Sequence, residues 1–137
     1  MLAIAVRLGV AAGLFAFCSF SLNEAAAEDL SVSQRAELQA TMFRFIDREA
    51  IRGSLLHLNI EDGTVESLSP VKAHPMIVRM GDYFVLCTNF RRESGKDVNV
   101  DFYLAKRDAG FEVFHTEIDN RKPLEELIER GKATPAE

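Results

Sequence analysis

The chain has 137 residues, of which 47% are hydrophobic and 27% charged, and its formal net charge is −5 at pH 7. This is the composition of an ordinary globular protein with one domain. A mildly acidic chain is poorly suited to the phosphate backbone of nucleic acids, so we expect no nucleic acid among its partners.

The first 27 residues differ from the rest of the chain. Arg7 precedes an apolar run that ends at Phe20, and a polar break and three alanines follow. This pattern predicts a secretory signal peptide over residues 1–27, cleaved after Ala27, and therefore a periplasmic or secreted protein with no membrane contact after cleavage. The alternative is an uncleaved membrane anchor over Leu2–Leu22, since about 20 apolar residues span a bilayer.

The two cysteines lie on either side of this cleavage site. Cys18 would leave with the signal peptide, and Cys87 would be the only cysteine of the mature protein. An intramolecular disulfide is then excluded, so the hydrophobic core must supply the stability. A disulfide from Cys87 to a partner stays open, because an odd cysteine in an exported protein can pair between molecules.

Residues 34–50 carry apolar side chains at intervals of three and four, the spacing of one helix face. We expect an amphipathic helix that begins near Ser31, because Ser31 and Gln34 fit a capping box, and Ser33 is a second possible cap. Arg52-Gly53 is expected to end it. The apolar positions are Leu38, Met42, Phe45 or Ile46, and Ala50. The face expected to meet solvent carries Arg35, Gln39, Arg44, Asp47 and Arg48.

The sequence after this helix is typical of antiparallel strands. Asp62-Gly63 separates two short β-prone runs, residues 54–61 and 64–69, which predicts a hairpin. Pro70–Pro75 predicts a loop or an edge, because proline cannot donate a ladder hydrogen bond. Further strands are expected at residues 76–80, 83–90, 97–104 and 111–119, and the last three of these form a predicted meander.

A short helix is predicted near the C-terminus. It starts near Asn120, has Pro123 in its first turn and ends at Gly131. Residues 132–137 are expected to form a frayed tail. A long helix, four to six antiparallel strands and a short helix predict a single α+β domain over residues 28–131, in which the N-terminal amphipathic helix packs on a curved sheet.

This order of elements resembles the cystatin-like folds and, more loosely, the nuclear-transport-factor-like cone folds. The resemblance lies in the helix over residues 34–50 followed by strands from Ser54 to Asp119, and it is one of layout only. The Gln-x-Val-x-Gly loop of cystatin inhibitors does not occur in the chain, so no function of either family is carried over.

The turn at Arg107–Gly110 determines the pairing of the last two strands. We expect a three-residue loop in which Gly110 takes the left-handed conformation. This register places Leu104 opposite Phe114 on an apolar face. A loop of two or four residues would slip the pairing by one and move each side chain to the other face.

On the reverse face the same register pairs Tyr103 with His115 and Asp101 with Glu117. A five-residue loop in the preceding hairpin sets Cys87 beside Asp101. One face of the predicted sheet then gathers the six candidate ligand-facing residues, namely Tyr83, Cys87, Asp101, Tyr103, His115 and Glu117.

Two interpretations of this polar face stay open. Asp101 and Glu117, directly opposed, would repel, and if both left water one would hold its proton, as in general acid/base sites. The simpler interpretation is that the face is the solvated side of an antiparallel sheet. No spacing in the chain is a catalytic signature, so catalytic roles stay unassigned.

A thiol nucleophile or a metal site would need other arrangements of these residue types. Cys87 and His115 are expected to lie two strands apart, roughly 9.5 Å, too far for a hydrogen bond. Cys87 is therefore expected to be a small, partly buried residue. The three histidines, His57, His74 and His115, have no metal-ligand spacing, and we expect neither a metal nor a cofactor.

The preferred interpretation is a small exported binding or interaction domain without catalysis. Its partner would be another protein, a second copy of the chain or a small molecule, held on an exposed sheet face or edge. The alternative is a small-molecule binding protein or acid/base enzyme of the cone-fold kind, with Asp101 or Glu117 as base and Tyr103 and His115 as hydrogen-bonding groups. A structural component held by a Cys87 disulfide is the third hypothesis.

Overall fold

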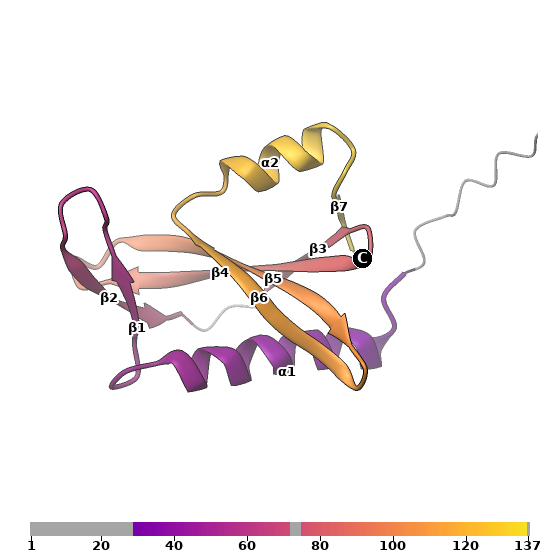
Figure 1. The fold of residues 1–137 in the computed structure, drawn as a ribbon, viewed down its shortest axis with the longest axis horizontal. Coiled ribbons are helices and arrows are strands. Elements are labelled where there is room, and N and C mark those ends of the chain that lie inside the picture. Colours follow the sequence, from indigo (N-terminus) through magenta and orange to yellow (C-terminus); the bar gives the residue numbers. More distant parts are fainter. Residues whose placement is uncertain (1–28, 72–74, 137) are drawn as a thin grey trace, which may run out of the picture.

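The computed structural model describes residues 29–71 and 75–136. The predicted signal peptide and His74 lie outside these residues. In chain order the elements are α1 (Val32–Glu49), β1 (Leu55–Leu58), β2 (Val65–Pro70), β3 (Met76–Met80), β4 (Tyr83–Arg92), β5 (Asp97–Arg107), β6 (Gly110–Ile118), α2 (Lys122–Glu129) and β7 (Thr134–Pro135). Figure 1 shows them coloured along the sequence.

The described chain is an α+β domain, with one long helix, one short helix and an antiparallel sheet, as predicted. The predicted number of strands, four to six, is too low, because the sheet has seven. The additional strand is β7, which lies in the expected frayed tail. Ala133 is buried there, and the backbone N–H of Ala136 donates to the carbonyl of Ile77 at 2.9 Å. An apolar anchor thus holds this segment on β3.

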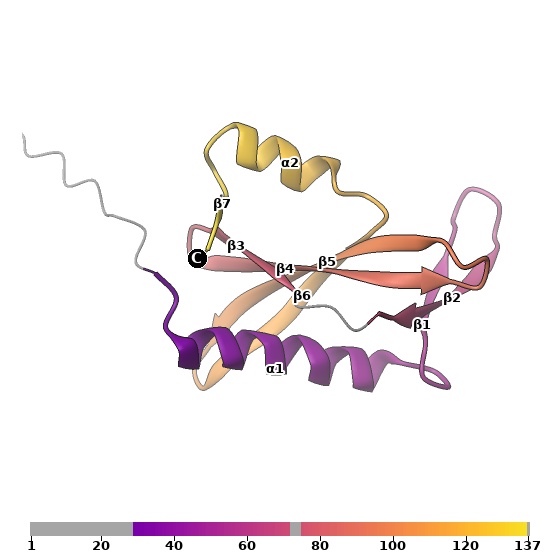
Figure 2. The same cartoon turned by 180° about the vertical axis from the view of Figure 1, so that it is seen from behind.

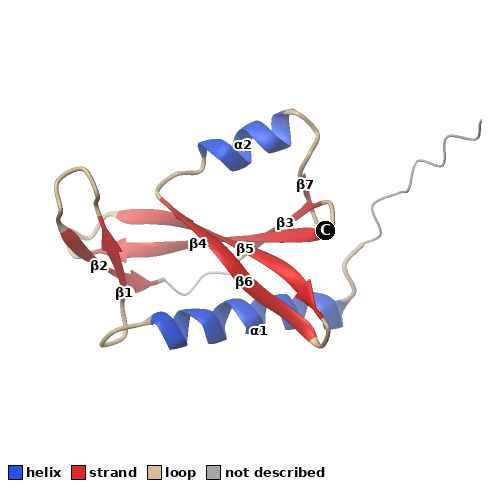
Figure 3. Ribbon diagram, in the orientation of Figure 1, coloured by secondary structure: helices blue, strands red, loops and turns tan. Residues whose placement is uncertain are grey.

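β4 is the centre of an open sheet (Figure 3). On one side it pairs with β5, and β6 lies beyond β5. On its other side β2 and β3 lie end to end, each paired with a different half of β4. β1 flanks β2 and β7 flanks β3, so β1, β6 and β7 are the edges of the described sheet.

α1 begins where the sequence predicts. The backbone N–H of Gln34 donates to Ser31 Oγ at 3.1 Å, and the Ser31 N–H donates to Gln34 Oε1 at 3.1 Å, which is the expected capping box. The helix ends at Glu49, before the predicted Arg52-Gly53. These two residues instead form a tight turn with φ of 55° and 83° between Ile51 and Ser54.

The two helices lie on opposite sides of the sheet, as Figures 1 and 2 show. Leu38, Met42 and Ile46 of α1 belong to a buried cluster with the apolar face of β4 and β5. Leu124 of α2 belongs to a second, smaller cluster on the reverse face. Its other buried members are Val78, Val85, Cys87, Tyr103 and Ala133. Each sheet face is therefore covered in part by one helix.

The pairing of β5 with β6 follows the predicted register only in the half of the hairpin that lies away from the turn. Asp101 lies opposite Glu117 and Tyr103 opposite His115, which is confirmed. The predicted pairing of Leu104 with Phe114 is wrong, because Leu104 pairs with Val113.

The cause is a tight two-residue loop at Asp108-Ala109, between the paired Arg107 and Gly110. Gly110, the residue that follows the two loop residues, has a positive φ of 114°, a conformation that glycine adopts without strain. The extra residue, Phe114, is absorbed as a bulge between the two halves of the ladder.

Candidate functional site

The predicted polar face is divided by α2 into a buried part and an open part. Asp101, Cys87 and Tyr103 are buried, with relative exposures of 1%, 5% and 7%. Tyr83 and His115 are exposed, and Glu117 is partly buried. The strand register brings the six residues to one face as predicted, and Cys87 pairs directly with Asp101. This face is therefore neither uniformly solvated nor one continuous pocket of the six.

The buried part is organised by an ion pair that the sequence analysis does not predict. Arg121, just before α2, places Nη2 at 3.0 Å from Asp101 Oδ1. The second carboxylate oxygen of Asp101 and the Nε of Arg121 are buried without a hydrogen-bond partner among the described residues. The charge of Asp101 is thus paired with a cation that stands at the N-terminus of α2.

The pKa values of Cys87 and Tyr103 are both raised, so neither side chain ionises near neutral pH. Burial, followed by the charge of Asp101, raises the pKa of the Cys87 thiol far above its ordinary value. The same two causes raise the pKa of Tyr103 to about 12. A reactive cysteine needs a lowered pKa and access to solvent, and Cys87 has neither.

The open part holds a second polar pair. His115 Nε2 lies 2.9 Å from Glu117 Oε1, and Asn120 Nδ2 donates to Glu117 Oε2 at 2.9 Å. The hydrogen bond with His115 is the main cause that lowers the pKa of Glu117, and the one from Asn120 adds to it. Glu117 is therefore held in its ionised form, which argues against a proton shared between Asp101 and Glu117.

The bulge adds an aromatic residue to this open part. The ring of Phe114 lies 5.6 Å from that of Tyr83 and 6.4 Å from that of Tyr103, measured between centroids. Phe114 and Tyr83 are 56% and 46% exposed. This contact is not predicted from the sequence, because the expected register places Phe114 on the opposite, apolar face.

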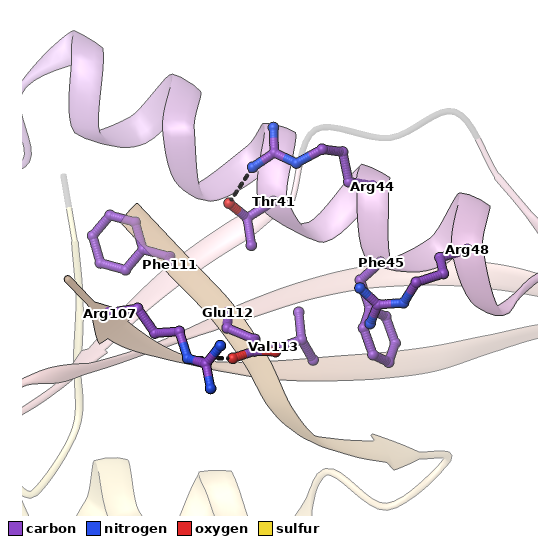
Figure 4. Close-up of a pocket in the computed structure, with 8 residues that line it drawn as sticks. All are labelled: Thr41, Arg44, Phe45, Arg48, Arg107, Phe111, Glu112 and Val113. Atoms are coloured by element: carbon purple, nitrogen blue, oxygen red, sulfur yellow. Dashed lines mark hydrogen bonds and ion pairs between the residues drawn. The ribbon is translucent and has the colours of Figure 1, made fainter. Parts of the chain in front are cut away.

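A cleft of about 220 Å³ lies on the other side of the sheet, between α1 and the β5–β6 hairpin. We call it the arginine cleft (Figure 4). Its lining comes from both elements and comprises Thr41, Arg44, Phe45, Arg48, Arg107, Phe111, Glu112 and Val113. Three guanidinium groups against one carboxylate make it positive, although the whole chain carries a net charge of −5.

Each guanidinium of the arginine cleft has a defined contact. Arg44 Nη2 donates to Thr41 Oγ1 at 2.9 Å, and the Arg48 guanidinium stands over the Phe45 ring at 5.3 Å. Arg107 Nε lies 2.6 Å from Glu112 Oε2. Arg48 also contacts Glu49 at 3.0 Å. Arg44 therefore donates to a neutral hydroxyl, and among the described residues no ion pair compensates its charge.

This cleft is not predicted by the sequence. From the sequence, Arg44 and Arg48 are expected on the solvated helix face and Arg107 in a turn. The sequence signal that could have indicated the cleft is Phe45, which the apolar spacing includes as an alternative to Ile46. An aromatic ring beside two arginines on one edge of a helix indicates a boundary between core and solvent. The position of Phe111 and Val113 beneath that edge depends on the bulge, which the sequence pattern does not reveal.

The comparisons with known proteins identify no relative. No protein-family model matches the chain, and neither the curated proteins nor the solved structures contain a significant match. The described residues contain no group of three potential metal ligands. Neither of the helices in residues 29–71 and 75–136 has the length and apolar character needed to cross a membrane.

Proposed function

We propose that this protein is an exported, non-catalytic binding module that holds a small organic anion in the arginine cleft. The observation that carries the proposal is the presence of three arginines, Arg44, Arg48 and Arg107, in the lining of one cleft that also has apolar walls. Its volume of about 220 Å³ is below the roughly 300–1,000 Å³ of pockets for drug-sized ligands, which favours a small ligand.

The chemistry of the lining favours a carboxylate or phosphate group on an apolar body. A planar guanidinium offers two parallel N–H donors to such an oxyanion, and these charge-assisted hydrogen bonds are stronger than neutral ones. Phe45, Phe111 and Val113 provide apolar surface beside the cations. We also propose that the amphipathic helix packs over one face of the curved sheet, as predicted from the sequence. In this position the helix forms one wall of the cleft.

Binding without catalysis is favoured by what the cleft lining lacks. It contains no histidine or cysteine, and its one carboxylate, Glu112, is paired with Arg107. Thr41 is buried, and the hydrogen-bond partner of its hydroxyl is the cation of Arg44. A cation cannot accept the hydroxyl proton, so Thr41 lacks the general base that a nucleophile needs. The lining supports holding an anion and supplies no group for proton transfer to it.

Titration of the isotope-labelled protein with benzoate, phenyl phosphate and the neutral benzamide tests the proposal by NMR. We expect the two anions to shift the amide signals of residues 41–48 and 111–113, and benzamide to leave them unchanged. The tighter of the two anions identifies the preferred head group. Amide shifts confined to other regions of the chain would contradict the site.

Single substitutions give this test its specificity. Arg44→Gln should weaken anion binding by at least about tenfold, since a hydrogen bond to a charged group contributes about 1.5–3 kcal/mol and about 1.4 kcal/mol is tenfold. Arg35→Gln is the matched control, because Arg35 lies nine residues earlier on α1 and therefore half a turn around the helix. Glu112→Gln should strengthen binding several-fold by releasing Arg107. Equal affinities in all three variants would exclude the arginine cleft as the binding site.

A further inference from the structure

The β1–β2 hairpin exposes a cluster of aliphatic side chains at the end of the sheet opposite β7 (Figures 1 and 2). Leu58 pairs with Val65, so these two side chains share a sheet face, and Leu56 lies on the same face two residues away. Soluble monomers rarely gather such residues on one surface. The exposed residues of this hairpin patch, 46% to 88% accessible, are Ile51, Leu56, Leu58, Ile60 and Val65.

β1 is also the least protected edge of the described sheet. It has β2 as its neighbour on one side and no other described strand beside it. Edge strands are usually protected by charges, proline or bulges. β6 carries two glutamates and the Phe114 bulge, and β7 has two residues, one of them Pro135. The sequence of β1, Leu-Leu-His-Leu, has no Asp, Glu, Lys, Arg or Pro.

We propose that two copies of the chain associate through β1, antiparallel, about a two-fold axis beside His57. This axis keeps equivalent side chains on the same sheet face, so Leu56 of one copy lies opposite Leu58 of the second copy. The two sheets then form one continuous sheet whose backbone edges are satisfied. The exposed leucines and Val65 of both copies make a shared apolar strip on one face.

The charges at the two ends of β1 complement one another in this arrangement. Arg52 lies just before β1, and Glu61 and Asp62 lie just after it. Antiparallel pairing brings the start of one β1 beside the end of the other, so Arg52 of each copy approaches these carboxylates of the second copy. Within the described residues Arg52 and Glu61 have no ion pair of their own. Opposite charges at both ends favour this register and orientation.

The size of the interface sets the expected affinity. β1 has four residues, so the interface is small and belongs with weak or transient associations. We therefore expect an exchange between monomer and dimer that depends on protein concentration. This association is independent of anion binding, because the arginine cleft is formed by α1 and the β5–β6 hairpin.

Sedimentation velocity of the protein purified from cells that express the full chain tests the association. The measurement covers dilutions up to about 100 µM, at which a micromolar Kd gives mostly dimer. A sedimentation coefficient that rises with concentration toward that of a dimer is the expected result. A monomer at every concentration would overturn the proposal and leave the hairpin patch to a different partner.

Two sets of variants link the dimer to β1. Leu58→Lys should weaken the dimer about 100-fold, because two lysines would enter the apolar strip. Phe43→Lys is the control, since Phe43 is similarly exposed, at 50% against 54%, but lies on α1. Circular dichroism shows whether each variant is folded. A dimer that survives Leu58→Lys would overturn the proposed interface.

A charge exchange tests the orientation of the two copies and does not depend on Leu58. Arg52→Glu should weaken the dimer by placing like charges at both ends of the paired strands. Adding Glu61→Arg to the same chain should recover most of the lost affinity, because in an antiparallel dimer each new arginine meets the new glutamate of the second copy. Equal dimerisation by all three proteins would exclude the antiparallel β1 register.

Discussion

Arg121 Nη2 lies 3.0 Å from Asp101 Oδ1, and this ion pair joins the start of α2 to β5. The Asp101 side chain is 1% exposed and that of Arg121 33%. Without the ion pair Arg121 could still be solvated by water, whereas the buried carboxylate of Asp101 could not. A buried ion pair adds little net stability over an apolar pair, but a buried charge that has lost its partner is strongly destabilising. Asp101 can therefore stay buried as a carboxylate only while α2 holds Arg121 beside it.

Arg121→Ala is expected to lower the free energy of unfolding by about 3 kcal/mol, because Asp101 stays buried without its cation. Urea denaturation measures this loss. Lys122→Ala is the control from the next position, since Lys122 is 82% exposed and its contact with Glu126 is 4.0 Å long. That change should cost less than about 0.5 kcal/mol. Equal losses in the two variants would show that Asp101 does not depend on Arg121.

The same ion pair changes the expectation for Asp101→Asn. On a solvated sheet face this substitution would alter stability by no more than about 0.5 kcal/mol. In the structure it removes the charge that faces Arg121, while Arg121 can still reach water. We expect a loss of about 1 kcal/mol, smaller than that for Arg121→Ala.

The burial of Cys87 predicts that its thiol is alkylated slowly in the folded protein. Cys87 is 5% exposed and its pKa is raised, so the thiolate that reacts with iodoacetamide is scarce in the folded protein. In a Cys18→Ser background, we expect alkylation at pH 8 to be at least about 100-fold slower than in urea.

A second thiol placed at an exposed turn calibrates this measurement. Ser94→Cys in the same background adds a thiol at the exposed β4–β5 turn, where alkylation should be fast. A non-reducing gel of the Cys18→Ser protein should show no covalent dimer, which tests the hypothesis of a structural component held by a Cys87 disulfide. Equal alkylation rates at the two positions in the folded protein would mean that β4 opens readily to solvent.

Local periodicity explains why most of the fold can be predicted from the sequence. The capping box of Ser31 and Gln34, and the alternation along β4 and β5, depend on residues close in sequence. The five-residue loop after Arg91 fixes the β4–β5 register without further information. The α+β class follows from these elements because each has one apolar face to bury.

The parts that could not be predicted depend on contacts between segments distant in sequence. The Phe114 bulge exists because Val113 and Phe111 face the α1 side while the hairpin closes at Gly110. β7 exists because Ala133 finds a buried site beside β3 and α2. Neither arrangement has a local signature, and both change which residues share a surface. The arginine cleft and the buried Asp101 follow from such contacts.

The hydrogen bond between His115 and Glu117 predicts a loss of stability in acid. Glu117 has a lowered pKa in the folded protein, so its ionised form stabilises the fold above the unfolded pKa of about 4.3. This contribution disappears as the pH falls through the lower, folded pKa. Both side chains are partly exposed, so its size should be about 0.5 kcal/mol.

His115→Ala and Glu117→Gln separate this pair from the other carboxylates. His115→Ala should raise the Glu117 pKa, read from the side-chain carboxyl signal by NMR, because the main cause of its lowering is gone. Asn120→Ala should raise it less, since its hydrogen bond lowers the pKa less than the one with His115 does. In urea titrations between pH 5 and pH 3, Glu117→Gln should lose less stability than the unchanged protein. An identical pH dependence in both would mean that Glu117 titrates as it does in the unfolded chain.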